Sequence, residues 1–395
     1  MAKLEQALQD AYLAELEKNA PVAHELNYWL ADHPEDPGKE FEACRRYVEI
    51  CREHGLSVEE NFCGLPTAFI AHAAKQQAPK CRIAILAEYD ALPNIGHGCG
   101  HSASGSLSLL TALSLKKFAD QFQADVDLIG TPDEERCGEK AKMVNQGAFD
   151  HYDMAIMIHL NSATTFSFMQ FLALSTYCVR FHGTPTHASA TPWEGRSALN
   201  GLMLAIHGID MLRQHVLPDT RMAYYISKGG EASNIVPKYA EMELCLRSGK
   251  RKYLDEVIAR VKKCIDGAAL ATETTAEMEL IGYHFSDMLL NQPGISALEE
   301  TMDELGIAWK PDDGSMLGSS DIANVSYVCP CFHPMLASSD HYFSMHSQDM
   351  VDVVKSEGVK EVINRGAKIM GITLLKFMTD ENLRKAIRED FLAKR

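Results

Sequence analysis

The chain has 395 residues, of which 46% are hydrophobic and 23% charged, and its formal net charge is −16. This composition is typical of a folded globular protein and excludes a largely disordered or fibrous chain. The acidic balance argues against a surface that binds nucleic acid or an anionic membrane. The length predicts two or three domains.

Neither a membrane span nor a secretory signal is expected. No apolar run reaches the ~20 residues that a membrane helix needs. The opening Met1–Ala20 lacks both the apolar stretch and the cleavage site of a signal peptide. The eleven cysteines are scattered without paired spacing, which favours reduced thiols in a cytoplasm.

The first half of the chain alternates between helix and strand signals. Apolar residues at helical spacing predict a helix over Glu40–His54, and helices are also expected over Ser102–Phe118 and, ending in Gly, over Glu139–Gly147. Short apolar runs predict strands over Arg82–Leu86 and Met154–Ile158, and Asp125–Gly130 (D-V-D-L-I-G) is also strand-like. Strands that alternate with helices indicate an α/β layer with a largely parallel sheet.

The middle of the chain changes character. Its predicted elements are, in order, Ser175–Phe181 (strand), Ser197–His215 (helix), Met222–Ser227 and Tyr239–Leu246 (strands), Leu254–Leu270 (helix) and Ala276–Leu280 (strand). This β-α-β-β-α-β order is the split βαβ unit of ferredoxin-like domains, in which helices cover one face of an antiparallel sheet.

After Tyr283 the α/β style returns, with helices predicted around Ile295–Leu305 and Ser356–Phe377. We therefore expect a catalytic domain with a mixed, mostly parallel sheet, formed by residues 1–173 and 284–395. A smaller α+β domain, residues 174–283, would be inserted between its two segments. Three tandem domains are the alternative that the length permits.

Two clusters of reactive side chains follow strands of the first half. The segment Ala87–His101 places His97, Cys99 and His101 among glycines, between a strand and a helix. Thiolate and imidazole are favoured ligands of a borderline-soft metal, and glycines let the backbone approach an ion. A tight turn with one thiol and two solvated imidazoles would also account for this pattern.

The second cluster is G-T-P-D-E-E-R at Gly130–Arg136. Adjacent carboxylates point in different directions, so one of Glu134 and Glu135 could bind a metal while the other takes a proton from water. A solvated acidic loop is the simpler explanation. Isolated histidines at strand ends and loops, namely His159, His187 and His346, are further candidates, although single histidines are more often structural.

Five stretches together resemble the M20 metallopeptidases, specifically their subfamily D of amidohydrolases. They are A-E-Y-D-A-L-P-N-I-G-H-G-C-G-H-S (87–102), G-T-P-D-E-E (130–135), H-A-S-A-T-P-W-E-G-R-S-A-L-N-G-L (187–202), G-G-E-A-S-N-I-V-P (229–237) and S-S-D-I-A-N-V-S (319–326). They occur in the family's order over nearly the whole chain. The resemblance also implies that the inserted domain acts as a lid and a dimerisation domain.

The resemblance implies a site with two divalent metal ions, zinc or manganese, with cobalt as a further option. The implied ligands are Cys99, a bridging thiolate, together with His101, Glu135, His159 and His346. Glu134 falls at the position of the general base. From the lid, His187 matches a histidine that polarises the scissile carbonyl in the partner subunit, and Asn234 matches a residue that contacts the substrate.

The implied activity is hydrolysis of an amide by a metal-bound water. The expected substrates are an N-acyl amino acid, an aminobenzoyl-glutamate-like amide or a dipeptide, and the expected assembly is a homodimer. The chain departs from the family at R-C-G-E-K (136–140), where glycines are common, and at Ser102, where Asn or Asp often stands. Arg136 and Cys137 therefore leave the substrate range open.

Two other classes remain open from the sequence. Cys99 could be the nucleophile of a metal-free cysteine hydrolase, activated by a nearby imidazole. The chain could instead be a non-catalytic accessory subunit that keeps the fold, although Glu134 argues against that.

Overall fold

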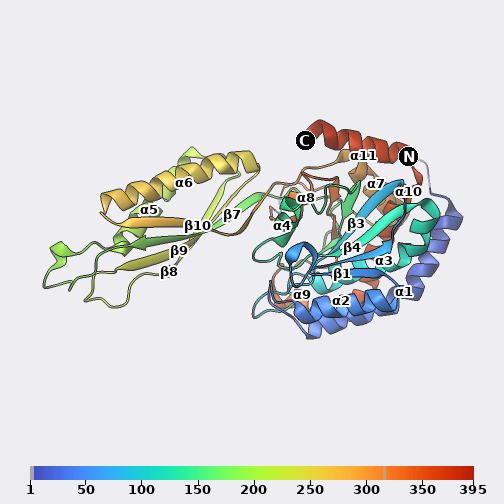
Figure 1. Cartoon of the computed structure of the whole chain (residues 1–395), viewed down its shortest axis with the longest axis horizontal. Helices are drawn as coiled ribbons and strands as arrows, with labels where there is room; N and C mark the ends of the chain where they lie inside the picture. Colours follow the sequence, from blue (N-terminus) through green and yellow to red (C-terminus); the bar gives the residue numbers. More distant parts are fainter. Residues whose placement is uncertain (1–3, 315–316) are drawn as a thin grey trace. The chain divides into compact units, whose positions relative to one another are not determined.

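The computed structural model describes residues 4–314 and 317–395. The chain folds into two compact units (Figure 1). One unit takes the chain up to Gln170 and again from Met288 onwards, and the other comprises Phe171–Asp287. The inserted unit extends a few residues beyond the predicted 174–283, because its first and last strands are longer than their apolar cores.

The larger unit contains a six-stranded mixed sheet in the order β1-β2-β4-β3-β5-β11. Strands β3, β4, β5 and β11 run parallel, while β2 is antiparallel to β4 and β1 to β2. A separate parallel pair joins β6 to β12. The bounds are β1 Ser57–Glu60, β2 Phe69–Ala74, β3 Cys81–Ala87, β4 Ala124–Gly130, β5 Met154–Ile156, β6 His159–Asn161, β11 Cys331–Phe332 and β12 Met335–Ala337.

Helix α3 (His101–Phe122) is the central helix of this unit. Most of its residues are buried, because it packs on β3 and β4 on one side and on α1 and α10 on the other. The other bounds are α1 Gln6–Asp32, α2 Phe41–Glu53, α4 Glu139–Asn145, α7 Gln292–Glu304, α8 Ile322–Val325, α9 Gln348–Lys355, α10 Val359–Thr379 and α11 Glu381–Lys394.

Strand β3 (C-R-I-A-I-L-A) is buried along nearly its whole length. A continuous apolar run of this kind is expected for a parallel strand that is covered on both faces. The predicted strands and helices of the first half are therefore confirmed. None of the helices in the described ranges is long and apolar enough to cross a membrane.

The inserted unit has a four-stranded antiparallel sheet in the order β10-β7-β9-β8. Two helices pack against one face of it (Figure 1). The alternating residues Ala240, Met242, Leu244 and Leu246 of β9 are all fully buried. The predicted ferredoxin-like order is thus confirmed. The bounds are β7 Ala173–His182, α5 Ala198–Leu212, β8 Arg221–Lys228, β9 Tyr239–Ser248, α6 Arg251–Ala271 and β10 Thr275–Phe285.

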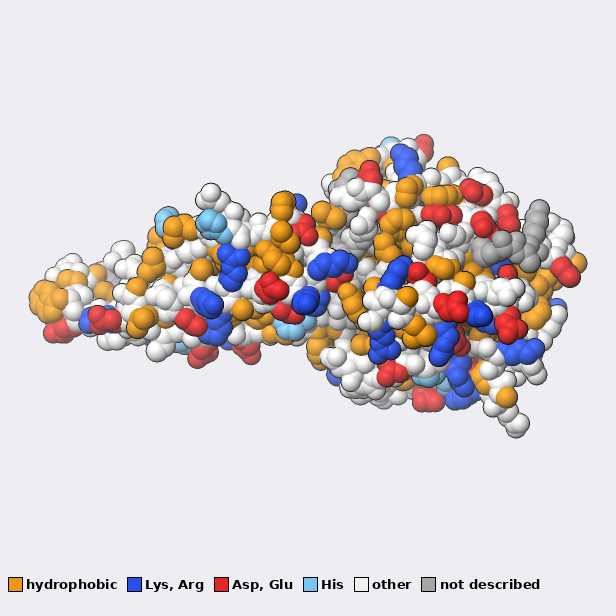
Figure 2. All heavy atoms as spheres, turned by 90° about the horizontal axis from the view of Figure 1, so that it is seen from above, with side chains coloured by type: hydrophobic (Ala, Val, Ile, Leu, Met, Phe, Trp, Pro, Cys, Tyr) orange, Lys and Arg blue, Asp and Glu red, His pale blue; other side chains and the backbone are white. Residues whose placement is uncertain are grey.

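Surface charges are mixed. On the face shown in Figure 2, acidic and basic side chains are interspersed and form no broad basic area. The formal net charge of the whole sequence is −16.

Candidate metal centre

The residues with reactive side chains lie where the parallel strands end. Strand β3 leads directly to Glu88 and Asp90, and β4 leads through Thr131 to Glu134 and Glu135. Functional groups of α/β sheets gather at this carboxyl edge. Cys99 and His101 come from the turn that opens α3, in which Gly100 has a φ of +90°.

Gly100 is needed in this turn for two reasons. Its left-handed backbone disfavours other residues, and a Cβ there would lie 3.1 Å from the Leu160 Cβ. The glycine therefore brings the Cys99–His101 segment close to the strand that carries His159.

Three groups of donor atoms meet at this edge. The first is Cys99, His101 and His159; the second is Cys99, Glu135 and His346; and the third is His101, Glu134 and Glu135. Within each group all ligand atoms lie within 4.8 Å of one another. The structure thus brings together the five side chains that were predicted as ligands, along with Glu134.

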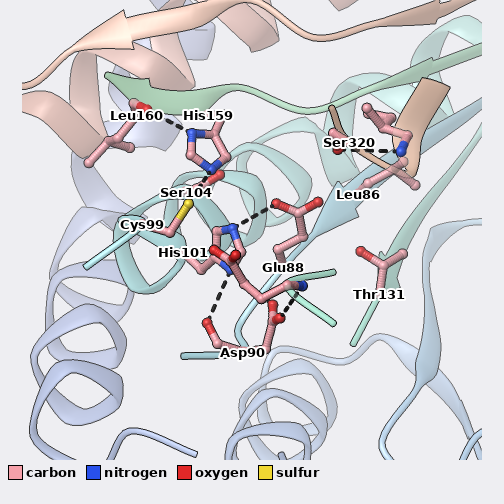
Figure 3. A network of polar contacts seen from close by, with 12 residues as sticks. Leu86, Glu88, Asp90, Cys99, His101, Ser104, Thr131, His159, Leu160 and Ser320 are labelled. Atoms are coloured by element: carbon pink, nitrogen blue, oxygen red, sulfur yellow. Dashed lines mark hydrogen bonds and ion pairs between the residues drawn. The ribbon is translucent and has the colours of Figure 1, made fainter. Parts of the chain in front are cut away.

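His101 is oriented by two carboxylates (Figure 3). Its Nδ1 lies 2.9 Å from Asp90 Oδ1, and its Nε2 lies 3.3 Å from Glu88 Oε2. Burial works against a positive charge here, but Cys99, Asp90 and Glu88 outweigh it and raise the pKa of His101 well above its usual value. The surroundings therefore favour a cation at Nε2, either a proton or a metal ion.

His159 is set up differently. Its Nδ1 donates to the carbonyl of Leu160 at 2.7 Å, which leaves the Nε2 lone pair facing Cys99 Sγ at 3.4 Å. Burial and the neighbouring His101 lower the pKa of His159 to about 4. The ring is neutral at ordinary pH, as a metal-ligating imidazole must be.

Glu135 and His346 approach each other from opposite ends of the sequence. Glu135 Oε1 lies 3.6 Å from His346 Nε2, and the Glu135 backbone N–H donates to Asp90 Oδ2 at 2.9 Å. His346 has a φ of +61°, an unfavourable value for a residue with a Cβ. A backbone hydrogen bond of 2.9 Å to the carbonyl of Gly98 holds it in place.

The donor set fits divalent cations. His101 Nε2 and Glu135 Oε1 are buried and make no hydrogen bond among the described residues, although most buried polar atoms in proteins make one. Their contacts are the ionisable groups of Glu88 at 3.3 Å and His346 at 3.6 Å. The set combines sulfur, imidazole nitrogen and carboxylate oxygen, which suits zinc and also accepts manganese or cobalt. Asp90 has the place of a supporting carboxylate, since it orients both His101 and Glu135.

Sequence reasoning missed a second layer of charged residues. Lys140 Nζ lies 2.6 Å from Glu88 Oε1 and 2.7 Å from Asp321 Oδ1, and all three side chains are buried. Burial raises the pKa of Glu134 well above its usual value, and Glu88 and Glu135 add to the effect. Glu88 and Asp90 lie in the quoted 87–102 stretch and Asp321 in the quoted 319–326 stretch, but spacing alone gave none of them a role.

His97 and Arg136 stay apart from the donor groups. His97 is buried, and neither ring nitrogen has a hydrogen-bond partner among the described residues. Burial and the neighbouring His101 lower its pKa to about 3. Arg136 is exposed directly after Glu135, and within the described ranges its guanidinium has no hydrogen bond or ion pair.

His187 and Asn234 lie next to each other in the inserted unit, and both are exposed. His187 Nδ1 accepts backbone hydrogen bonds from Ser189 at 3.2 Å and Ala190 at 3.1 Å. A neutral ring must then carry its proton on Nε2. The Asn234 carbonyl accepts from the Ala188 N–H at 3.0 Å, which ties the two loops together.

Comparison with known sequences gives consistent matches. Residues 173–273 match a family model described as a peptidase dimerisation domain. A Xaa-Arg dipeptidase of Mus musculus is 31% identical over 349 residues, which cover 86% of this chain and 80% of the mouse protein. A p-aminobenzoyl-glutamate hydrolase polypeptide of Escherichia coli (strain K12) is 31% identical over 297 residues, covering 70% of this chain and 60% of that protein.

Solved structures share the architecture. An aminobenzoyl-glutamate utilization protein from Klebsiella pneumoniae has a TM-score of 0.75 at 18% identity, over 92% of this chain and 98% of that one. A Bacillus subtilis protein described as a dinuclear metal binding peptidase from the M20 family has a TM-score of 0.68 at 17% identity, over 92% and 99% of the two chains. At these identities the likeness concerns the fold, and it confirms the predicted two-part architecture.

Proposed function

The chain belongs to the M20 family of peptidases and amidohydrolases, and on that premise we propose that it is a metal-dependent amidohydrolase that cleaves the amide bond of a small substrate. One observation carries the proposal. The donor atoms of Cys99, His101, His159, Glu135 and His346 converge in interlocking groups, with each group within 4.8 Å. Scattered structural residues would have no reason to meet in this way.

The five side chains would hold two divalent cations, zinc or manganese, with cobalt as an option. Bound there, such cations would lower the pKa of water and polarise a carbonyl group. Cys99 is the one side chain common to the group with His101 and His159 and the group with Glu135 and His346, which supports a role in holding both cations.

Glu134 is the proposed general base. It is half-buried, and its carboxylate lies within 4.8 Å of donor atoms of His101 and Glu135. Loss of solvent around the carboxylate raises its pKa, as does the negative charge of Glu88, so the side chain can hold a proton between two steps. It would take that proton from the attacking water and give it to the departing amine.

His187 is the proposed oxyanion donor. Its Nδ1 accepts from two backbone N–H groups, so a neutral ring carries its proton on Nε2, and the side chain is exposed. A donor fixed in this way is suited to the charge that develops on a carbonyl oxygen. Asn234, tied to the same loop, would contact the substrate. We place both residues in the partner's site of a homodimer formed through the inserted unit.

The substrate is proposed to be an N-acyl amino acid, an aminobenzoyl-glutamate-like amide or a dipeptide. The exposed guanidinium of Arg136, directly after Glu135, supports a substrate that carries a carboxylate. The eleven cysteines, all free, support a reducing cytoplasm as the location.

A metal-free cysteine hydrolase is less well supported. Burial and the nearby Glu135 raise the pKa of Cys99 well above that of a free thiol. A nucleophilic cysteine needs the opposite shift, because the thiolate is the reactive form.

The test is a hydrolysis screen. The protein is stripped with a chelator and reloaded with Zn²⁺, Mn²⁺ or Co²⁺, then assayed on N-acyl amino acids, aminobenzoyl-glutamate and dipeptides. We expect activity to disappear with the metal and to return with it. Activity that survives the chelator but not a thiol alkylator would favour the cysteine hydrolase. Protein without metal or hydrolysis across the panel would favour an accessory subunit.

A further inference from the structure

Lys140 is the one cation buried among the acidic groups behind the proposed metal centre, as far as the described residues show. Its side chain has no exposed surface, and its ammonium group lies 2.6 Å from Glu88 Oε1 and 2.7 Å from Asp321 Oδ1. Its backbone N–H donates to the other oxygen of Asp321 at 2.9 Å. Asp321 therefore holds the lysine at two points, where helix α4 begins.

The carboxylates around this ammonium form a second donor set. Oxygen atoms of Glu88, Glu134 and Asp321 lie within 4.8 Å of one another. Three carboxylates at such spacing are a ligand set that hard divalent cations such as Mg²⁺, Ca²⁺ and Mn²⁺ favour. In the folded chain, the ammonium of Lys140 already lies against two of the three.

We propose that Lys140 is a positioning residue whose ammonium takes the place of a third divalent cation and thereby keeps Glu134 free to act as a base. The proposal rests on the proposed function, because Glu134 is the base assigned there. A carboxylate bound to a divalent cation has its lone pair engaged and cannot accept a proton readily. An ammonium fixed to Glu88 and Asp321 offsets part of their negative charge and leaves Glu134 outside its ion-pair contacts.

The contacts of Glu88 show why a fixed cation is needed beside the proposed metal centre. Glu88 uses one oxygen for Lys140 and lies 3.3 Å from His101 Nε2 with the other. The acidic set is therefore continuous with the proposed metal centre, because Glu88 contacts both Lys140 and His101. Unlike a dissolved ion, a lysine held by its own backbone does not exchange. A purely structural ion pair would contribute stability but would not change how many ions the protein binds.

The experiment measures metal stoichiometry in the full-length chain. Wild type and Lys140→Met are stripped, dialysed against Mn²⁺ and weighed by native mass spectrometry, with metal analysis in parallel. We expect two Mn²⁺ per subunit in the wild type and three in Lys140→Met. Lys140→Arg keeps the cation and should stay at two. Lys140→Met/Asp321→Asn lacks one of the three carboxylates and should return to two.

Kinetics give a second readout. With rising Mn²⁺, the kcat of Lys140→Met should fall by about 100-fold, within the range that a general base contributes, while KM changes little. Wild type should reach a plateau. Folded Lys140→Met that still binds two ions, with an Mn²⁺ response like that of wild type, would overturn the proposal.

Loss of a buried partner can also prevent folding. If metal-free Lys140→Met is unstable, its Tm should rise more steeply with Mn²⁺ than that of wild type, since an additional ion binds the folded state. Equal slopes would contradict the inference. The outcomes separate the two proposals: wild type that binds no metal refutes the proposed function, whereas two ions in both proteins refute only the role of Lys140.

Discussion

Asp90 is the residue around which the centre is organised. One of its oxygens lies 2.9 Å from His101 Nδ1, and the other accepts the backbone N–H of Glu135 at 2.9 Å. Burial would raise the pKa of Asp90, but the neighbouring His101 lowers it below its usual value. A single ionised carboxylate thus orients candidate ligands from the Cys99–His101 turn and from the loop after β4.

The two adjacent glutamates should separate in their effects. Glu134→Gln removes the proposed base, so kcat should fall by about 100- to 10,000-fold while metal content stays near two ions. Glu135→Gln removes a proposed ligand and should lower the metal content. Both are measured by kinetics and metal analysis of the same preparations. Glu139→Gln, on the following helix, is the control and should change neither. Equal metal loss in Glu134→Gln and Glu135→Gln would show that the roles of base and ligand are wrongly assigned to this pair.

A histidine of strand β2 should contribute to the stability in a pH-dependent way. His72 Nδ1 lies 2.6 Å from Asp127 Oδ1, and this hydrogen bond raises the pKa of His72. The stabilisation that the His72–Asp127 pair gives the folded state is therefore fully present below the pKa of histidine in the unfolded chain, near 6.5. It is lost as the pH rises through the higher pKa of His72 in the folded chain. We expect the Tm difference between wild type and His72→Gln to shrink as pH increases.

The partner residue supplies the control for this pH effect. In an Asp127→Asn background, His72→Gln should show a much smaller pH-dependent difference, because the carboxylate that raises the pKa most is gone and only Glu59, 3.3 Å from His72 Nε2, remains. Thermal unfolding followed by circular dichroism at several pH values measures both series. A difference that grows with pH would show that the sign is wrong.

At the scale of single residues, the sequence predicted the candidate metal ligands but not the charged residues that hold them in place. Cys99 and His101 stand two positions apart among glycines, a pattern that can be seen without a structure. Lys140 and Asp321 are 181 residues apart, and nothing in either neighbourhood indicates the other. Long-range pairs between common charged residues leave no spacing signal.

At the scale of elements, close packing of α3 makes the site sensitive to small changes. A Cβ on Gly105 would overlap the hydroxyl of Tyr47 and the backbone carbonyl of Glu88. Gly105→Ala should therefore destabilise the protein by about 1–3 kcal/mol, as overpacking does, and weaken metal binding by displacing Glu88. Denaturant unfolding and metal titration measure the two effects.

Gly267 is the matched control for that substitution. It also lies in a helix interior, in α6, but nothing stands within 4 Å of a Cβ built there. Gly267→Ala should stabilise the chain by about 0.5–1 kcal/mol, because alanine loses less backbone freedom on folding. Similar effects from the two alanines would contradict the packing argument.

Elements with a strong period were predictable, and those without one were not. Helix α2 and strand β9 show clear apolar periodicity and were predicted closely. Helix α1 was missed although Tyr12, Leu16 and Ala20 share a buried face, because Pro21 lies inside it. Strands β11 and β12 have two and three residues, too few to display a period of two.

At the scale of the whole molecule, the position of His187 gives a test of assembly. His187→Ala and Glu134→Gln should each be inactive alone. If His187 serves the partner subunit, mixed dimers contain one intact site, and random mixing restores about a quarter of wild-type activity. Refolding an equimolar mixture and assaying it measures this recovery.

The control for this mixture is His187→Ala refolded with the double variant His187→Ala/Glu134→Gln. It should remain inactive, because no subunit supplies the histidine. An inactive mixture of the two single variants would mean that His187 acts within its own subunit, whereas full activity of His187→Ala alone would mean that it has no role.

The order of elements along the chain was enough to predict the two-part organisation. A complete β-α-β-β-α-β set in the middle, with α/β patterns on both sides, indicates an insertion. What spacing could not give was the strand order of the larger sheet, since β11 pairs with β5 across the whole inserted unit.

That pairing has a consequence for synthesis. Strand β5 leaves the ribosome long before Cys331–Phe332, and the entire segment Phe171–Asp287 is translated in between. In the nascent larger unit, the edge of β5 therefore stays unpaired until β11 is synthesised. The smaller unit, whose strands pair among themselves, can fold as soon as it emerges. His346 comes later still, so the cation-binding apparatus proposed above is assembled only near the end of translation.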